Sequence, residues 1–275
     1  MTSRILCKDD PELTYLHGYA RRLAKPPLQR AAVGIRRVQP IGRFMEILSS
    51  MLKSRQPLVV GSVGSEKALE GLYSAKDCDL VELRLDALGN GANVHRFARS
   101  QQDSLPVLLT ARHPDEGGMN QLSIRQRAGI VSEFLPVGGL LDLELRSLEE
   151  LEDVWESAAE MGMVRIASWH DFTECPSRER LGEIVDEMAG TGADVAKCAF
   201  ALEKPEEIQR IAEALEGAPL PLSIMGMGPL GPASRLFAAH LGSVLNYGYL
   251  GEEATAPGQW PAKLLREVIS CSKSS

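Results

Sequence analysis

The chain has 275 residues, which is enough for one large domain with a single core or for two small domains. Hydrophobic residues make up 44% of it and charged residues 24%, and no apolar run reaches the roughly 18 residues that a transmembrane helix needs. The net charge of −7 disfavours a nucleic-acid partner, because phosphate binding requires a basic surface, so we expect neither nucleic acid nor a membrane among its partners.

Residues 1–56 differ from the rest of the chain in charge and in pattern. They hold 11 Lys and Arg against 4 Asp and Glu, a balance of +7, so residues 57–275 carry −14. Apolar periodicity is weak apart from RFMEILSSMLKS, where a short lead-in helix is predicted. We expect a basic N-terminal extension that is poorly ordered or partly helical. Organellar targeting is less favoured, because transit peptides avoid acids such as the three in CKDDPE.

From residue 57 onward, short aliphatic runs alternate with amphipathic stretches. The predicted strands are 58–63, 80–85, 106–111, 139–145, 164–168, 194–200, 221–225 and 243–248. The predicted helices are 65–76, 93–102, 123–135, 147–162, 177–192, 204–217, 231–242 and 258–270. Eight such units with short connections predict an α/β fold, a (β/α)8 TIM barrel over residues 57–275. An open doubly wound sheet is disfavoured, because no Gly-rich dinucleotide turn follows the first strand.

Such a barrel gathers functional side chains at the C-terminal ends of its strands. The second predicted strand ends with Glu82, Arg84 and Asp86, which share one face because side chains alternate along a strand. Asp142 and Glu144 share one face of the fourth strand in the same way. The alternatives are an ordinary polar strand face and, for the last two acids, structural partners of a neighbouring cation. Because parallel strands are buried on both sides, we favour a functional site.

The third, fifth and sixth strands add further titratable groups. Arg112 leaves the third strand, and Glu116 follows in the loop TARHPDEGG, whose glycines allow close approach of the backbone. His170 ends the fifth strand, and Lys197 lies in the sixth. Singly, these residues also suit a charged surface loop, a core histidine and a lysine that reaches solvent. Together, on adjacent strands and inward faces, they predict an active site.

A lysine that is partly desolvated beside other cations has a lowered pKa and acts as an amine nucleophile. Its product with a ketone is an iminium that acidifies the adjacent C–H bond, and His170 then suits general acid–base catalysis. The chain has no Gly-x-Ser-x-Gly nucleophile elbow, and its five cysteines and five histidines lack metal-ligand spacing. Free thiols favour a cytoplasmic location. The residues therefore predict Schiff-base chemistry on a small polar carbonyl compound.

Seven short motifs, in this order along the chain, resemble those of type I 3-dehydroquinate dehydratase: ELRLD, TARHPDEGG, DLEL, SWHDF, VAKCA, MGPLGPASR and TAPGQ. The resemblance covers residues 57–270. It implies a (β/α)8 barrel, a homodimer, and no metal or organic cofactor. It also implies a shikimate-pathway enzyme of aromatic amino acid biosynthesis, whose small-molecule substrate, 3-dehydroquinate, is dehydrated to 3-dehydroshikimate.

The resemblance also assigns roles to individual residues. Lys197 matches the Schiff-base lysine, His170 the histidine that transfers the proton, and Glu116 the loop acid that pairs with this histidine. Asp142 stands where the family has a supporting aspartate.

Six further residues match groups that bind the substrate. Arg235 matches the arginine that binds the carboxylate, and Gln259 the glutamine of a closing loop. Thr255, in that same loop, stands where many members have serine and keeps the hydroxyl. The remaining matches hold the ring hydroxyls, and they are Glu82, Arg84 and Arg112.

Two other functions are compatible with the same residues. One is another Schiff-base lyase of the class I aldolase type, which would share Lys197 but has no evident use for SWHDF with the EGG loop. The other is a non-catalytic regulator that senses quinate or shikimate on the same fold. The intact set of Lys197, His170, Glu116 and Arg235 argues against a regulator, because a binding protein does not need the nucleophile.

Overall fold

The computed structural model describes residues 41–272, apart from residues 72, 103 and 257. The predictions for residues 1–40 lie outside this part of the chain. Eight parallel strands follow one another in it: β1 (Leu58–Val63), β2 (Leu80–Arg84), β3 (Val107–Thr110), β4 (Leu140–Glu144), β5 (Val164–Asp171), β6 (Val195–Ala201), β7 (Leu222–Met227) and β8 (Leu245–Tyr249). Their order in the sheet is β7-β6-β5-β4-β3-β2-β1-β8, so β1 lies between the second strand and the last.

The sheet curls until its two edge strands, β7 and β8, meet. Their contact is made by scattered hydrogen bonds: the Val244 amide donates to the Leu222 carbonyl at 3.0 Å, and the Ser223 hydroxyl donates to the Leu245 carbonyl at 2.6 Å. The Ser243 hydroxyl in turn accepts from the Ile224 amide at 3.0 Å. Eight parallel strands thus form a nearly closed barrel, and the predicted (β/α)8 fold is confirmed.

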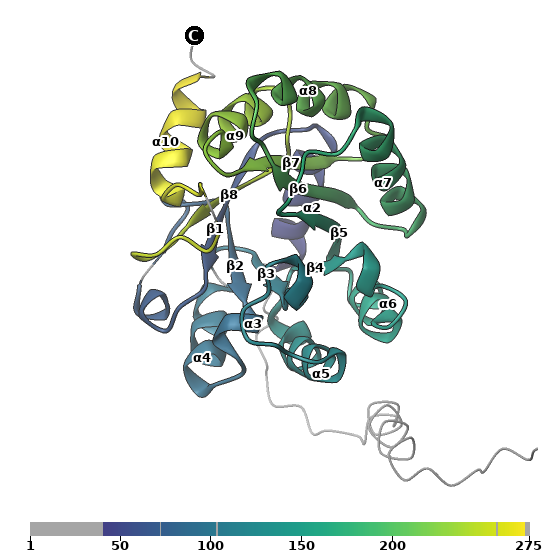
Figure 1. Cartoon of the computed structure of the whole chain (residues 1–275). Helices are drawn as coiled ribbons and strands as arrows, with labels where there is room; N and C mark the ends of the chain where they lie inside the picture. Colours follow the sequence, from purple (N-terminus) through teal and green to yellow (C-terminus); the bar gives the residue numbers. More distant parts are fainter. Residues whose placement is uncertain (1–40, 72, 103, 257, 273–275) are drawn as a thin grey trace, which may run out of the picture. The chain divides into compact units, whose positions relative to one another are not determined.

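Helices alternate with the strands and surround them (Figure 1). Serine caps begin several of them: the Ser123 hydroxyl accepts from the Gln126 amide, and the Ser177 hydroxyl accepts from the Arg180 amide. None of the described helices is long and apolar enough to cross a membrane. The helices are α2 (Ile41–Lys53), α3 (Leu85–Leu88), α4 (Ala92–Gln101), α5 (Ile124–Phe134), α6 (Glu152–Glu160), α7 (Arg178–Gly190), α8 (Ile208–Gly217), α9 (Gly231–His240) and α10 (Ala262–Ser272).

One predicted helix, 65–76, was wrong. Among the described residues of this stretch, which exclude residue 72, the one helical element is a 3-10 turn, Lys67–Glu70. Gly71 leaves the turn in an extended conformation, and the Tyr73 hydroxyl donates to the Ala68 carbonyl at 2.8 Å. The Gly71 amide donates to the same carbonyl at 3.3 Å, so the turn closes with a 3-10 bond and the chain then becomes extended.

Two apolar layers hold the barrel together. The outer layer lies between the strands and the surrounding helices. The inner layer fills the barrel at the N-terminal ends of the strands, and it includes Leu48 and Leu52 of α2. Helix α2, which covers the predicted lead-in segment, therefore packs across the N-terminal end of the barrel (Figure 1). The opposite, C-terminal end is left for polar side chains.

Candidate active site

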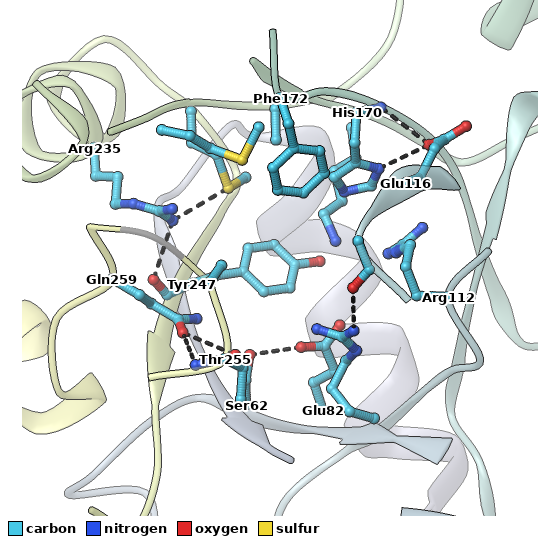
Figure 2. A pocket seen from close by; sticks show the side chains of 17 residues that line it. Ser62, Glu82, Arg112, Glu116, His170, Phe172, Arg235, Tyr247, Thr255 and Gln259 are labelled. Carbon is cyan, nitrogen blue, oxygen red and sulfur yellow. Dashed lines mark hydrogen bonds and ion pairs between the residues drawn. The ribbon is translucent and has the colours of Figure 1, made fainter. Parts of the chain in front are cut away.

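One pocket opens at the C-terminal ends of the strands (Figure 2). Strand register explains why: Lys197 lies level with Ser168 on β5, and Arg84 lies level with Thr110 on β3, so inward polar side chains share a height. Nine of the ten predicted site residues line this pocket. They are Glu82, Arg84, Arg112, Glu116, His170, Lys197, Arg235, Thr255 and Gln259. The tenth, Asp142, contacts the lysine and is fully buried.

Lys197 is 4% exposed, and two groups hold its ammonium. Its Nζ donates to Asp142 Oδ2 at 2.7 Å and lies 4.0 Å from the centroid of the Tyr247 ring. Burial lowers the pKa of Lys197 below its ordinary value; Asp142 opposes this effect, and the nearby Arg112 charge adds to it. A lysine with a lowered pKa is deprotonated more readily and is then a nucleophile.

Asp142 links the lysine to a buried chain of alternating charges. It binds Arg112 Nη2 at 2.8 Å and accepts from the Ser168 hydroxyl at 2.6 Å. Burial alone would raise its pKa, but Arg112 and Lys197 hold it well below its ordinary value, so Asp142 is ionised. Glu144 continues the chain, because it binds Arg112 Nη1 at 2.9 Å and also Arg127. Each of these buried ions, from Lys197 to Arg127, contacts an ion of opposite charge, which burial requires.

His170 and Glu116 form a pair at one wall of the pocket. Glu116 Oε2 lies 3.0 Å from His170 Nδ1 and accepts from the His170 amide at 3.0 Å. Burial raises the pKa of Glu116 to about 7. Burial, together with the Arg112 and Lys197 charges, lowers the pKa of His170 well below its ordinary value. Because Nδ1 is engaged by the carboxyl, Nε2 is the ring nitrogen that remains for a ligand.

A second aspartate, Asp86, positions the loop that carries Glu116. Arg84 donates to it twice, at 3.0 and 2.8 Å, and also donates to the Gly117 carbonyl at 3.0 Å. Asp86 accepts further from the amides of Arg112 and Met119. Gly117 has a φ of 84°, which a side chain would strain. The glycines of the loop are therefore needed to bring the carboxyl to the histidine.

Arg235, in α9, is buried but has no acidic partner among the described residues. It is 3% exposed, and its Nη1 contacts only the Met225 sulfur at 3.2 Å and the Tyr247 carbonyl at 3.3 Å, while Nε has no partner there. Burial lowers its pKa to about 10. A buried cation of this kind is costly unless an anion binds to it. The pocket therefore contains a site for a ligand carboxylate or another anion.

The segment between β8 and α10 covers the pocket from the opposite side. Gln259 Oε1 accepts from both the Thr255 amide, at 2.9 Å, and the Thr255 hydroxyl, at 2.8 Å. These bonds occupy the amide oxygen, so the NH₂ group of Gln259 remains for a ligand. The Thr255 methyl packs on Gly64, where an added Cβ would lie only 2.7 Å from it. On the pocket floor, Glu82 accepts from Ser62 at 2.5 Å and from Thr110 at 2.9 Å.

Several lining residues were not predicted. Phe172 stood inside the motif SWHDF, and its ring packs against Gly117. Ser62 and Tyr247 lie on inward positions of β1 and β8, which the alternation of side chains would have revealed. The role of Asp86 was also missed, although its position was noticed. Within the described residues, no three His, Cys, Asp or Glu side chains are grouped to hold a metal ion.

Known proteins resemble this chain in sequence and in structure. Residues 57–275 match the family model described as type I 3-dehydroquinase. The 3-dehydroquinate dehydratase of Methanococcoides burtonii is 30% identical over 226 residues, which cover 78% of this chain and 94% of that protein. That of Methanothrix thermoacetophila is 30% identical over 221 residues, which cover 80% and 94%.

The solved structures agree. The 3-dehydroquinate dehydratase of Geobacillus kaustophilus has a TM-score of 0.69 and 26% identity, and the match covers 80% of this chain and 92% of that one. The type I enzyme of Clostridium difficile, solved with covalently modified comenic acid, has a TM-score of 0.69 and 25% identity, with 80% and 94% covered. With a family match over most of its length, the chain belongs to the type I 3-dehydroquinase family.

Proposed function

We propose that this enzyme is a hydro-lyase that dehydrates 3-dehydroquinate to 3-dehydroshikimate. The observation that carries the proposal is the content of one pocket: a buried lysine, a histidine–carboxyl pair and a buried arginine without an acidic partner among the described residues. These groups match a substrate that has a ketone, an acidic C–H bond beside it and a carboxylate. Family membership and the relatives' printed activity support the same substrate.

In the proposed mechanism, Lys197 is the nucleophile. Its neutral amine attacks the ketone carbon, and loss of water from the carbinolamine gives an iminium. Asp142 supports this step, because its carboxylate lies 2.7 Å from Nζ and stabilises the cationic forms of the nitrogen. The iminium withdraws electrons and acidifies the neighbouring C–H bond.

His170 then transfers the proton. Its free Nε2 removes the proton beside the iminium and returns it to the departing hydroxyl in a syn elimination. Glu116 keeps the ring in the tautomer that has a lone pair on Nε2, because its carboxylate accepts from Nδ1. Hydrolysis of the product iminium releases 3-dehydroshikimate and regenerates Lys197.

The remaining residues bind and orient the substrate. Arg235 binds the carboxylate, and its Nε, which has no partner among the described residues, supports this assignment. Thr255 and Gln259 close over the ligand, with the Gln259 NH₂ as a donor. The ring hydroxyls are held by Glu82, Arg84 and Arg112. Both terminal nitrogens of Arg112 already donate within the protein, to Asp142, Glu144 and Ser168.

The steps need no metal or organic cofactor. On the resemblance of the motifs we further propose a cytoplasmic homodimer that serves the shikimate pathway, with a catalytic barrel over residues 57–275 and an extension over 1–56. A turnover assay separates these functions from the alternatives. Incubation with 3-dehydroquinate should produce the enone absorbance of 3-dehydroshikimate. A regulator would bind without producing it, and an aldolase-type lyase would leave this substrate unchanged.

A further inference from the structure

Tyr247 carries a hydroxyl whose position is unusual for a buried phenol. The residue is 4% exposed, and its hydroxyl oxygen has no hydrogen-bond partner among the described residues. Buried tyrosines ordinarily find such a partner, because an unsatisfied hydroxyl destabilises the fold. Phenylalanine would pack the same ring without that disadvantage. The hydroxyl therefore calls for an explanation that protein packing does not supply.

The surroundings of the ring show where the hydroxyl acts. Alternation along β8 turns Tyr247 into the barrel, and the residue lines the pocket. Lys197 Nζ lies 4.0 Å from the ring centroid, and the backbone carbonyl of Tyr247 accepts from Arg235 at 3.3 Å. In Figure 2 the hydroxyl points into the middle of the pocket, away from Arg235 and toward the side that carries His170 and Glu82. The phenol is thus directed into the pocket, and the Lys197 amine lies over the face of its ring.

We propose that the Tyr247 hydroxyl donates a hydrogen bond to the ketone oxygen of the substrate while Lys197 attacks the ketone carbon. This proposal rests on the proposed function. As the N–C bond forms, the C–O π bond breaks, and its electron pair moves to the oxygen. The amine then loses a proton and the oxygen gains one, which gives the neutral carbinolamine. Tyr247 keeps its own proton and stabilises the negative charge that develops on the oxygen, as donors of oxyanion holes do.

The electrostatics of the site favour a donor that stays protonated. Burial, together with the charges of Asp142 and Glu82, raises the pKa of Tyr247 well above its ordinary value. The phenol is therefore protonated at neutral pH. The other donors near the amine are engaged, because Ser168 and Arg112 both bind Asp142. Arg235 is reserved for the carboxylate in the proposed binding mode, which leaves the phenol for the ketone.

The test is Tyr247→Phe, which keeps the ring, the packing and the contact with the lysine. Saturating 3-dehydroquinate is mixed with the enzyme, borohydride is added after varied delays, and the mass of the Lys197 peptide reports the adduct. We expect the variant to form the adduct roughly 10²-fold more slowly, as when one oxyanion donor is removed. KM should change little, and the melting temperature should stay the same or rise, because an unsatisfied buried hydroxyl has been removed.

Tyr249→Phe is the matched control. It makes the same chemical change two residues further along β8, at a side chain that does not line the pocket, and should form adduct at the wild-type rate. An unchanged rate of adduct formation in Tyr247→Phe would overturn the proposal, whatever its melting temperature. A raised KM with an unchanged rate would also overturn it, because the hydroxyl would then only bind the ground state. If the wild-type enzyme itself is never trapped, the proposed function has failed instead.

Discussion

The same strands build two halves of the barrel interior: a lower half at their N-terminal ends and an upper half at their C-terminal ends. The two halves have opposite chemistry. The lower inward positions of five strands are aliphatic, namely Leu58, Leu80, Leu108, Leu140 and Val164. Four residues further along each of these strands, or just beyond its end, the inward positions are polar: Ser62, Arg84, Arg112, Glu144 and Ser168. The lower half is stabilised by contacts that any good packing would provide. The upper half is stabilised only while each charge keeps its partner.

This difference separates what folds the barrel from what the barrel does. Buried ion pairs contribute little net stability, because desolvation offsets their attraction. Loss of one partner is nevertheless destabilising, because the other charge is then buried without compensation. The aliphatic side chains of the lower half tolerate substitution with a loss of stability that grows with the volume removed. Changes in the upper half should therefore affect chemistry first, and changes in the lower half should affect stability first.

The largest effect on chemistry is expected for Lys197→Ala. The variant should lose borohydride trapping and nearly all turnover, because no other described lysine lies in the pocket. Mass spectrometry of the trapped peptide and the enone assay measure both properties. Lys76→Ala, at an exposed lysine, is the control and should behave as wild type. An adduct that persists in Lys197→Ala would place the nucleophile at another lysine.

His170→Ala should come next. Turnover should fall by roughly 10²–10⁴-fold, as for other general acid–base groups, while the lysine adduct still forms. Glu116→Gln should have a smaller effect, because in the proposed mechanism this residue positions the histidine and does not transfer the proton. Steady-state rates of the two variants give the ranking. A Glu116→Gln enzyme slower than His170→Ala would reverse the assigned roles.

The same pair also predicts a pH dependence. Below a pH of about 7, the raised pKa makes the Glu116 carboxyl neutral, so it no longer accepts from Nδ1. The imidazole proton can then move to Nε2, and the lone pair that acts as the base is lost. We therefore expect kcat/KM, which reports the free enzyme, to fall as the pH drops through about 7 and to level off above it. Glu116→Gln should flatten this limb of the profile.

Arg235→Ala should mainly weaken binding. A carboxylate that is held equally in the ground state and the transition state contributes to KM more than to kcat. Loss of one partner of a buried charge pair costs roughly 2–5 kcal/mol, so KM should rise by about 30-fold or more. Initial rates over a wide range of 3-dehydroquinate concentrations measure it. An unchanged KM would assign the carboxylate to another residue.

Gly64→Ala should have a moderate effect on the closing segment. Its Cβ would meet the Thr255 methyl at 2.7 Å, and that methyl is held in place because the Thr255 hydroxyl donates to Gln259. Overpacking typically costs about 1–3 kcal/mol, so KM should rise about tenfold. Adding Thr255→Ser removes the methyl, keeps the hydroxyl and should restore KM. Gly129→Ala, at a helical glycine with open space around it, is the control. No rescue by the double variant would mean that the methyl is not the obstacle.

The smallest effect on catalysis is expected in the lower half. Leu140→Ala should reduce the free energy of unfolding by roughly 2–5 kcal/mol while kcat and KM stay near wild type at low temperature. Denaturant unfolding measures the free energy of unfolding, and the enone assay measures kcat and KM. A loss of activity that matches the loss of stability would show that the two halves are not separable.

Part of this site could be predicted because the alternation of side chains along a strand is a local property, whereas Arg235, Thr255 and Gln259 were predicted only from the resemblance of the motifs. Glu82, Arg84 and Lys197 needed only the alternation of side chains to be placed on inward faces. The 3-10 turn after β1 was not predicted, because the composition of KALE also fits a longer helix, whereas the backbone becomes extended at Gly71. Arg127 reads as an exposed helix residue in IRQRAG, yet it is buried against Glu144. The sequence likewise does not reveal that the buried Tyr247 hydroxyl has no hydrogen-bond partner among the described residues.

The edge between β7 and β8 is where we expect the barrel to open locally. Serine hydroxyls replace part of the backbone ladder there, so amides along this edge should exchange with deuterium sooner than those of the continuous strands. Arg235 follows β7 and Tyr247 lies on β8, so a ligand that contacts both spans this edge. In the proposed binding mode the substrate would join these two edge strands, so we expect hydrogen exchange in β7 and β8 to slow when the pocket is occupied.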